Sequence, residues 1–234
     1  MSFRFRQFSV EDDQSSMRIG TDAVLLGAWI NPGNRSEILD IGTGCGVIAL
    51  MMAQKCNAAI TAIDIDEDSV HQAAANFRNT PWNSRMNAIH CPFQEFSRLP
   101  GKSFSLIMTN PPFFRNSLRS PLKSRNFARH DDQLKTLDLI TGVTRILDGD
   151  GKFCLILPAM DAITFQSDAN EHDLYLTRQL EVKSKPGSKL KRIAMEFSFS
   201  PPEQVITEEI IIRREDNSFT DAYRELTKDF YIEL

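Results

Sequence analysis

The stretch Ile38-Leu39-Asp40-Ile41-Gly42-Thr43-Gly44-Cys45-Gly46 runs from a short apolar segment directly into three alternating glycines. The apolar segment predicts a buried strand, and residues 46–55 predict a helix with an apolar face. At such a strand-to-helix turn, backbone N–H groups face a ligand and the glycines allow it to approach closely. A tight turn that holds no ligand is the alternative interpretation.

From Glu37 to Pro158, short apolar runs alternate with helical patterns, which is typical of β-α-β units and a parallel sheet. The predicted strands lie at residues 38–41, 59–63, 86–91, 104–109 and 153–157. One helix is predicted to begin after an N-cap at Asp66, and another to cover residues 134–147.

The pattern differs at the two ends of the chain. Beyond Pro158, a helix near residues 159–169 is followed by strand-like stretches at 174–182, 193–200 and 204–213. Because short connections join these stretches, at least one antiparallel strand is expected there. Before the sheet, Thr21 is predicted to cap an apolar helix that ends at Trp29.

Composition excludes several classes of protein. The 234 residues carry a formal charge of −4, which argues against a general basic DNA-binding protein. No apolar run approaches the roughly 18 residues of a membrane-spanning helix, and residues 1–6 lack the apolar region of a secretory signal. The four scattered cysteines have no histidine at zinc-ligand spacing. We therefore expect a cytoplasmic protein with free thiols, no metal, no membrane contact and no obligate protein partner.

Two carboxylates indicate which ligand the glycine turn holds. Asp40 precedes a G-x-G-x-G pattern rather than the dinucleotide pattern G-x-G-x-x-G, and its charge would repel a pyrophosphate but attract an ammonium group. Asp64 ends the second strand, where it could accept hydrogen bonds from a ribose diol or serve only as an acid near the next helix. S-adenosylmethionine contains both an amino acid and a ribose, so it is a ligand that matches both carboxylates. The predicted cofactor contacts are Asp40, Gly42, Gly44, Gly46 and Asp64, with Phe93 and Gln94 near the adenine.

The segment Asn110-Pro111-Pro112-Phe113 follows the fourth strand, at the carboxyl end where open α/β sheets carry their chemistry. A planar NH₂ group conjugated to a ring is a poor nucleophile, because its lone pair is delocalised. Two acceptors, the Asn110 side-chain oxygen and the Pro111 carbonyl, would favour a pyramidal nitrogen and free that lone pair. Phe113 would stack on the flat substrate. A turn of two prolines beside a packed Phe is the alternative.

Ten of the 27 Lys and Arg residues lie in two segments that contain no acid, residues 115–130 and 183–192. Positive charge directly behind the reactive loop is what phosphates flanking an extruded base would require. The predicted RNA-binding residues are Arg115, Arg119, Lys123, Arg125 and Arg129. A solvated charged loop is the alternative for the first segment, and a plain turn for the second.

Residues 38–113 resemble the class I S-adenosylmethionine-dependent methyltransferases of the N-P-P-[YF] type. The wider chain resembles the tRNA1(Val) (adenine-N6) methyltransferase family. The segments that carry this resemblance are Phe3-Arg4-Phe5-Arg6-Gln7-Phe8, residues 18–29, Ala128-Arg129-His130 and Asp229-Phe230-Tyr231. The resemblance implies a Rossmann-like α/β fold, with helices on both faces of a mostly parallel seven-stranded sheet and at least one antiparallel strand near its carboxyl-terminal end. It also implies a single domain overall, in which residues 1–35 form an arm and capping helix and residues 36–234 form the methyltransferase domain. Within the capping helix, the resemblance implies that Thr21 or Asp22 touches the cofactor.

The leading hypothesis is an enzyme that methylates N6 of an adenine in tRNA, next to the anticodon of a valine tRNA, with S-adenosylmethionine as methyl donor. Methylation of a guanine N2 in RNA, or of a protein glutamine amide, would use the same acceptor geometry. The basic segment argues against the protein substrate but does not separate adenine from guanine. A third interpretation is a non-catalytic protein that binds RNA or the cofactor, and the intact Asp40, Asp64 and Asn110 argue against it.

Overall fold

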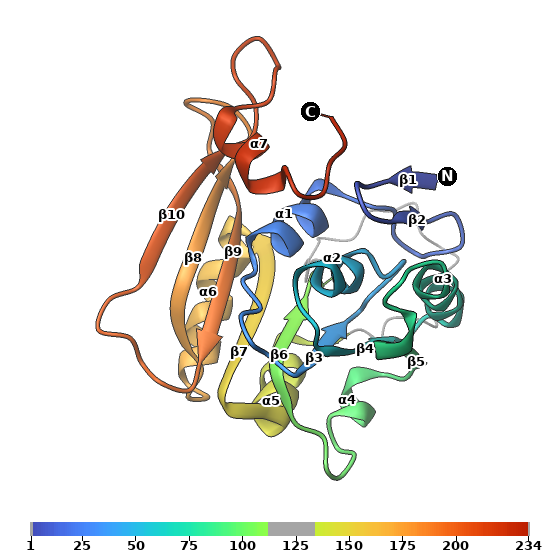
Figure 1. Cartoon of the computed structure of the whole chain (residues 1–234). Helices are drawn as coiled ribbons and strands as arrows, with labels where there is room; N and C mark the ends of the chain where they lie inside the picture. Colours follow the sequence, from blue (N-terminus) through green and yellow to red (C-terminus); the bar gives the residue numbers. More distant parts are fainter. Residues whose placement is uncertain (1, 112–133, 234) are drawn as a thin grey trace, which may run out of the picture.

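A computed structural model describes residues 2–111 and 134–233, and an eight-stranded sheet runs through its centre (Figure 1). In order across the sheet, the strands are β10 (Ile206–Ile211), β8 (Tyr175–Lys183), β9 (Leu190–Ser198), β7 (Leu147–Pro158), β6 (Phe104–Thr109), β3 (Glu37–Ile41), β4 (Ala59–Asp64) and β5 (Met86–His90). A separate two-stranded sheet, β1 (Ser2–Arg4) and β2 (Ser9–Glu11), lies at the amino terminus.

Only β9 runs against its neighbours in the large sheet, and it pairs antiparallel with both β7 and β8. The other pairs are parallel, which confirms the predicted mostly parallel sheet with an antiparallel strand near the carboxyl-terminal end. The sheet has one strand more than the seven expected. The additional strand is β10, which pairs with the outer edge of β8 after a short connection from β9.

Helices cover both faces of the sheet, as predicted (Figure 1). One face is covered by α1 (Thr21–Trp29), α2 (Val47–Lys55), α3 (Glu67–Arg78) and α7 (Asp221–Thr227), and the other by α4 (Phe93–Phe96), α5 (Thr136–Ile146) and α6 (Ala159–Asn170). Successive strand residues enter opposite cores, because side chains alternate across a strand. Ile38 therefore packs with the first group of helices and Leu39 with the second.

The amino-terminal arm is fixed to the other end of the chain. The backbone N–H of Arg6 donates to the carbonyl of Phe230 over 2.8 Å, and its Nε donates to the carbonyl of Tyr231 over 2.7 Å. The buried ring of Phe5 stacks on Phe8 at 4.7 Å and on Tyr231 at 6.0 Å. The two termini consequently lie close together in Figure 1.

Two local predictions need correction. Thr21 is the first residue of α1 rather than its N-cap; Gly20 occupies the cap position, and no side chain caps this helix. β7 begins at Leu147, well before Phe153, because Leu147 pairs with Phe104 across a register shift; a Cβ at Gly151 would lie 2.7 Å from the Leu147 side chain. The predicted N-cap of α3 is confirmed, since the Asp66 carboxylate accepts from the Ser69 N–H over 3.1 Å.

No helix within the described ranges is long and apolar enough to cross a membrane. Within the same ranges, no three His, Cys, Asp or Glu side chains are grouped as metal ligands would be. All four cysteines (Cys45, Cys56, Cys91 and Cys154) are free.

Candidate functional site

The carboxyl ends of β3 and β6 bring two predicted site segments together. Ile41 pairs with Thr109 in the parallel register of these strands, so Gly42 and Asn110, the residues that follow them, lie next to each other at the ends of the two strands. The buried Thr109 hydroxyl also donates to the Ile41 carbonyl over 2.8 Å. The structure therefore places the glycine turn directly beside Asn110.

The glycine turn has one side packed on protein and one side open. A Cβ at Gly46, whose φ is +84°, would lie 2.5 Å from the Phe77 ring of α3. Among residues 2–111 and 134–233, a Cβ at Gly42, whose φ is +67°, would meet no heavy atom within 4 Å apart from those of its chain neighbours. Gly46 is therefore required by helix packing, whereas Gly42 leaves room for a ligand to approach the backbone.

Asp40 lies wholly buried beneath this turn. Its Oδ2 accepts a hydrogen bond from the Thr43 hydroxyl over 2.7 Å, while its Oδ1 has no partner within the described part of the chain. Burial raises the pKa of Asp40 to about 7. A buried carboxylate oxygen without a donor fits the ammonium group of S-adenosylmethionine, which would supply both a donor and a compensating charge.

Asp64 ends β4 on the other side of the turn and holds the turn in place. Its Oδ2 accepts from the Gly44 N–H over 2.8 Å, and its Oδ1 accepts from the Asp66 N–H over 3.0 Å. Burial nevertheless raises the pKa of the Asp64 carboxyl. Each carboxylate oxygen can accept more than one hydrogen bond, so two ribose hydroxyls fit this group as additional donors.

Sequence reasoning missed a row of buried polar side chains on α3, formed by Ser69, Gln72 and Asn76. The Asn76 amide donates to the carbonyls of Cys45 over 2.8 Å and Glu11 over 2.9 Å, which ties the glycine turn to the amino-terminal arm. The Ser69 hydroxyl accepts from the N–H of the arm residue Ser16 over 3.1 Å. Their spacing of three and four residues on one helix face was the available signal.

Asn110 and Pro111 offer the acceptors that the sequence predicts. Asn110 is half-buried and Pro111 is buried. Within the described ranges, neither the Asn110 side chain nor the Pro111 carbonyl has a hydrogen-bond partner. Phe113 and the predicted RNA-binding residues Arg115, Arg119, Lys123, Arg125 and Arg129 lie outside the described residues.

The remaining predicted cofactor residues differ in their surroundings. Phe93 is a buried core residue whose ring packs against Gly142 of α5, whereas the next residue, Gln94, is half-buried. Thr21 is exposed, and the Asp22 carboxylate forms a 2.8 Å ion pair with Arg192 of β9.

Solved methyltransferase structures share this fold. A predicted O-methyltransferase from Agrobacterium tumefaciens superposes with a TM-score of 0.67 at 16% identity, covering 89% of this chain and 96% of its own. The N-methyltransferase NodS from Bradyrhizobium japonicum, solved with S-adenosyl-L-homocysteine, superposes with a TM-score of 0.53 at 17% identity, covering 74% and 82%. At these identities the similarity establishes the fold alone.

Sequence comparison identifies the family. Residues 15–156 match the Methyltransferase small domain family. A protein from Phocaeicola vulgatus named tRNA1(Val) (adenine(37)-N6)-methyltransferase is 41% identical over 99% of this chain and 98% of its own. Proteins of the same name from Bacteroides thetaiotaomicron (40% identical, 99% and 98% covered) and Trichodesmium erythraeum (38%, 98% and 97%) match equally completely. The chain therefore belongs to the family of tRNA1(Val) (adenine(37)-N6)-methyltransferases.

Proposed function

We propose that this chain transfers a methyl group from S-adenosylmethionine to the exocyclic N6 of an adenine in tRNA. The observation that supports the proposal is the register of β3 and β6, which brings Asn110 next to Gly42, in the turn that follows the buried Asp40. The relatives named above act on adenine(37) of tRNA1(Val), and we propose the same nucleotide as the substrate here.

The cofactor would lie across the carboxyl ends of β3 and β4. Asp40 would face its ammonium group, the backbone at Gly42 and Gly44 would line its path, and Asp64 would accept hydrogen bonds from its ribose. Gln94 and the backbone near it would contact the adenine ring, because the Phe93 ring is engaged in core packing. S-adenosylmethionine supplies a methyl group on a positively charged sulfur, which is open to attack by an amine.

The chain's own contribution to the reaction is to hold and polarise the target amine. The Asn110 side-chain oxygen and the Pro111 carbonyl would accept its two hydrogens, and Pro111 has no N–H that could compete for them. The Thr109 hydrogen bond to Ile41 would position the Asn110 acceptor before substrate arrives. Rate acceleration then comes from positioning and from fixed dipoles. Phe113 would stack on the adenine ring, and the basic residues that follow it would bind the flanking phosphates.

The proposal extends to the organisation of the chain and its place in the cell. Residues 1–35 would act as an arm and capping helix on the methyltransferase domain of residues 36–234. A tRNA substrate and four free thiols fit a reducing cytoplasm.

The test is incubation of the purified protein with methyl-deuterated S-adenosylmethionine and an unmodified valine tRNA transcript, followed by nucleoside mass spectrometry. The proposal expects labelled N6-methyladenosine, and no label in a matched transcript that carries guanine in place of adenine(37). Label in guanosine, or in protein glutamine, would contradict it.

A further inference from the structure

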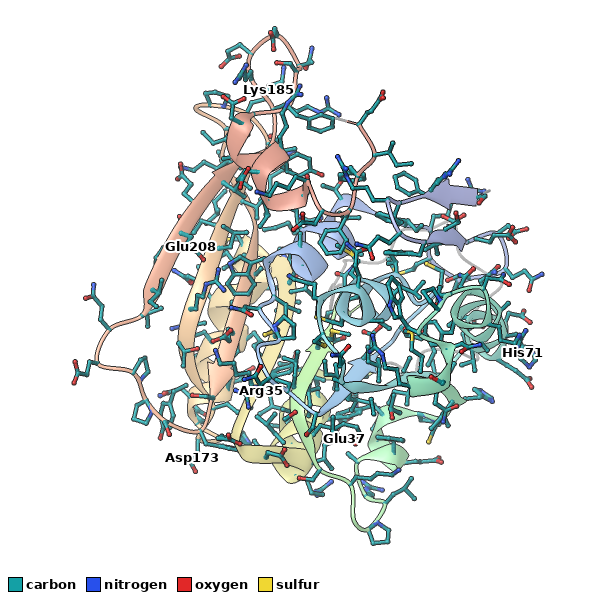
Figure 2. The ribbon with its side chains drawn as sticks, in the orientation of Figure 1. Arg35, Glu37, His71, Asp173, Lys185 and Glu208 are labelled. Carbon is teal, nitrogen blue, oxygen red and sulfur yellow. The ribbon has the colours of Figure 1, made fainter. Side chains whose placement is uncertain are left out.

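A cavity of about 500 Å³ lies apart from the glycine turn, at the end of the sheet formed by β8, β9 and β10. It is bordered by the last residues of β8 and the residues that follow β10, by the first residues of β9 and α1, and by α7 and the amino-terminal arm. Figure 2 shows Lys185 in the turn above β8 and β9, at the same end of the molecule as α7. Thr21 and Asp22, which the family resemblance assigns to the cofactor, border this cavity, but the cofactor path proposed above, across the carboxyl ends of β3 and β4, does not account for the cavity itself.

Aromatic side chains from both ends of the chain form one wall of the cavity. The Phe219 ring stacks on Tyr223 at 5.0 Å with 17° between the planes, and Tyr223 lies 6.5 Å from Tyr231. Tyr231 in turn meets the edge of Phe3, whose ring is 38% exposed. The Arg213 guanidinium lies 4.1 Å from the centre of the Phe219 ring. The wall is therefore a row of packed rings, of which Tyr223 is only 2% exposed, with the exposed Phe3 at one end and the exposed Arg213 at the other.

The cavity also carries positive charge that protein acids only partly neutralise. Lys191, Arg192 and Arg213 line it, together with two acids, Asp22 and Glu233. Arg192 is paired with Asp22, whereas the exposed Lys191 has no ion-pair partner within residues 2–111 and 134–233. Lys191 and Arg192 belong to the basic turn 183–192, which the proposed chemistry does not use. Flat surfaces beside unneutralised cations match a nucleotide, whose base stacks and whose phosphate is negative.

The strand register connects this cavity to the methyl-transfer site. Arg192 pairs with Pro158 at the carboxyl end of β7 and with Val182 near the end of β8. Thr109, which precedes Asn110, pairs with Leu155 of β7. Arg192 therefore lies two strand spacings across the sheet and three residues along it from Thr109, roughly 14 Å away at the same edge of the sheet. An RNA strand whose target base lies at Asn110 can reach the cavity with a nucleotide a few positions away.

We propose that this aromatic and cationic cavity binds a second, unstacked nucleotide of the RNA substrate, close to the target adenine in the same strand. The inference rests on the proposed function and deepens it, since a second base pocket would select RNA loops in which two bases are unstacked. The base stacks on the surfaces formed by Arg213, Tyr231 and Phe3, and Lys191 faces a phosphate.

Three variants of the full chain separate stacking from charge, with binding to the valine tRNA transcript measured across a salt series. Lys191→Gln removes one phosphate contact, so the slope of log K against log salt falls by about 0.7 and the Kd rises about threefold near 0.15 M salt. Arg213→Lys keeps the charge but loses the planar group, so the Kd rises about fivefold with little change of slope. Arg98→Gln, in the exposed turn that leads to the opposite end of β6, is the matched control and leaves both quantities unchanged.

Photocrosslinking provides a second measurement that does not depend on methyl transfer. A 4-thiouridine-substituted transcript should crosslink to peptides that contain Phe3, Phe219 or Tyr231, and the crosslink should weaken in Arg213→Lys. The kcat of saturated enzyme and the Kd for S-adenosylmethionine should stay at wild-type values in both cavity variants. If the wild-type protein forms N6-methyladenosine while the cavity variants bind RNA normally and these peptides remain uncrosslinked, the inference is overturned and the proposed function stands. If the crosslinks form but no N6-methyladenosine appears, the cavity assignment is supported and the proposed function fails.

Discussion

The hydroxyl of Thr109 donates a 2.8 Å hydrogen bond to the backbone carbonyl of Ile41, which joins the last residues of β6 and β3. Each of these residues directly precedes a segment of the proposed site: Asn110 follows Thr109, and Gly42 follows Ile41. A contact in the sheet thus sets the distance between Asn110, the proposed hydrogen-bond acceptor for the target amine, and the proposed cofactor turn.

Replacing Thr109 by Val should lower kcat by about tenfold or more, because it releases this junction while keeping the side-chain shape. The buried hydrogen bond is lost, so the free energy of unfolding should also fall by about 1–3 kcal/mol. Thr80→Val is the control, since the buried Thr80 hydroxyl donates over 2.9 Å to the Phe77 carbonyl at the end of α3. A comparable loss of kcat in both variants would show that general destabilisation, not the junction, is responsible.

Replacing Asn110 by Ala should remove the side-chain acceptor for the target amine and reduce the single-turnover rate by about 10²–10³-fold or more. The Kd for S-adenosylmethionine, measured by calorimetry, should change little, because Asn110 is assigned to the substrate. Asn110→Asp keeps an acceptor oxygen and should retain more activity than the alanine variant. A single-turnover rate within twofold of wild type would remove Asn110 from the chemistry.

Replacing Gly42 by Ala should weaken S-adenosylmethionine binding by about tenfold or more, because the new methyl group would enter the space left for the ligand. Gly33→Ala is the control, since Gly33 also has a positive φ (+53°) and open space around it but lies in the loop before β3. Both variants should lose about 1–2 kcal/mol of stability from backbone strain. Equal cofactor affinities in thermal-shift and calorimetric titrations would contradict the assignment of the turn.

The affinity for S-adenosylmethionine should rise with pH between about 5.5 and 7.5, by up to about tenfold per pH unit at the acidic end. The pKa of buried Asp40 is about 7 without ligand, and the ammonium group favours the ionised carboxylate. The range stops at 7.5 because α-amino groups themselves lose a proton near pH 8. Calorimetry at several pH values is the measurement, and Asp40→Asn should flatten the dependence. A wild-type Kd that is constant over this range would exclude the pairing.

The same carboxyl affects stability in the opposite direction. The unfolded chain releases the Asp40 proton near its ordinary pKa of 3.8, whereas the folded protein keeps it to about pH 7. Between these values the folded state binds more protons, so the contribution of Asp40 to the free energy of unfolding falls as pH rises. Bound cofactor would offset this loss, because it stabilises the ionised form in the folded state.

The parts of the fold that were predictable from sequence are those with local periodicity. The units from β3 to β6 follow from the alternation of apolar runs with helical patterns. The start of α3 was predictable from Asp66, because an N-cap bonds a backbone N–H only three residues away. β10 lies within the strand-like stretch predicted at residues 204–213, but its place beside β8 was not predictable, because that place depends on pairing across the connection from β9. The prediction of Thr21 as N-cap was wrong by one residue, because the neighbouring Gly20 occupies the cap position of α1.

The same distinction holds for the site. Asp40 lies in a predicted strand, and the glycine turn, Asp64 and Asn110 each follow one, so the rule for carboxyl ends brings them together without knowledge of packing. Phe93 is predicted to lie near the adenine. Its buried ring packs against Gly142 of α5, and this contact between distant segments is not visible in the sequence. The aromatic and cationic cavity was beyond sequence reasoning, since it joins Phe3 to Tyr231 from opposite ends of the chain.

The most direct test of the account is a crystal structure of the protein with S-adenosylhomocysteine. We expect the ribose hydroxyls within hydrogen-bond distance of the Asp64 carboxylate, the amino group near Asp40, and the sulfur directed toward Asn110. A ligand bound elsewhere, or a nicotinamide dinucleotide occupying the space above Gly42 in its place, would contradict it.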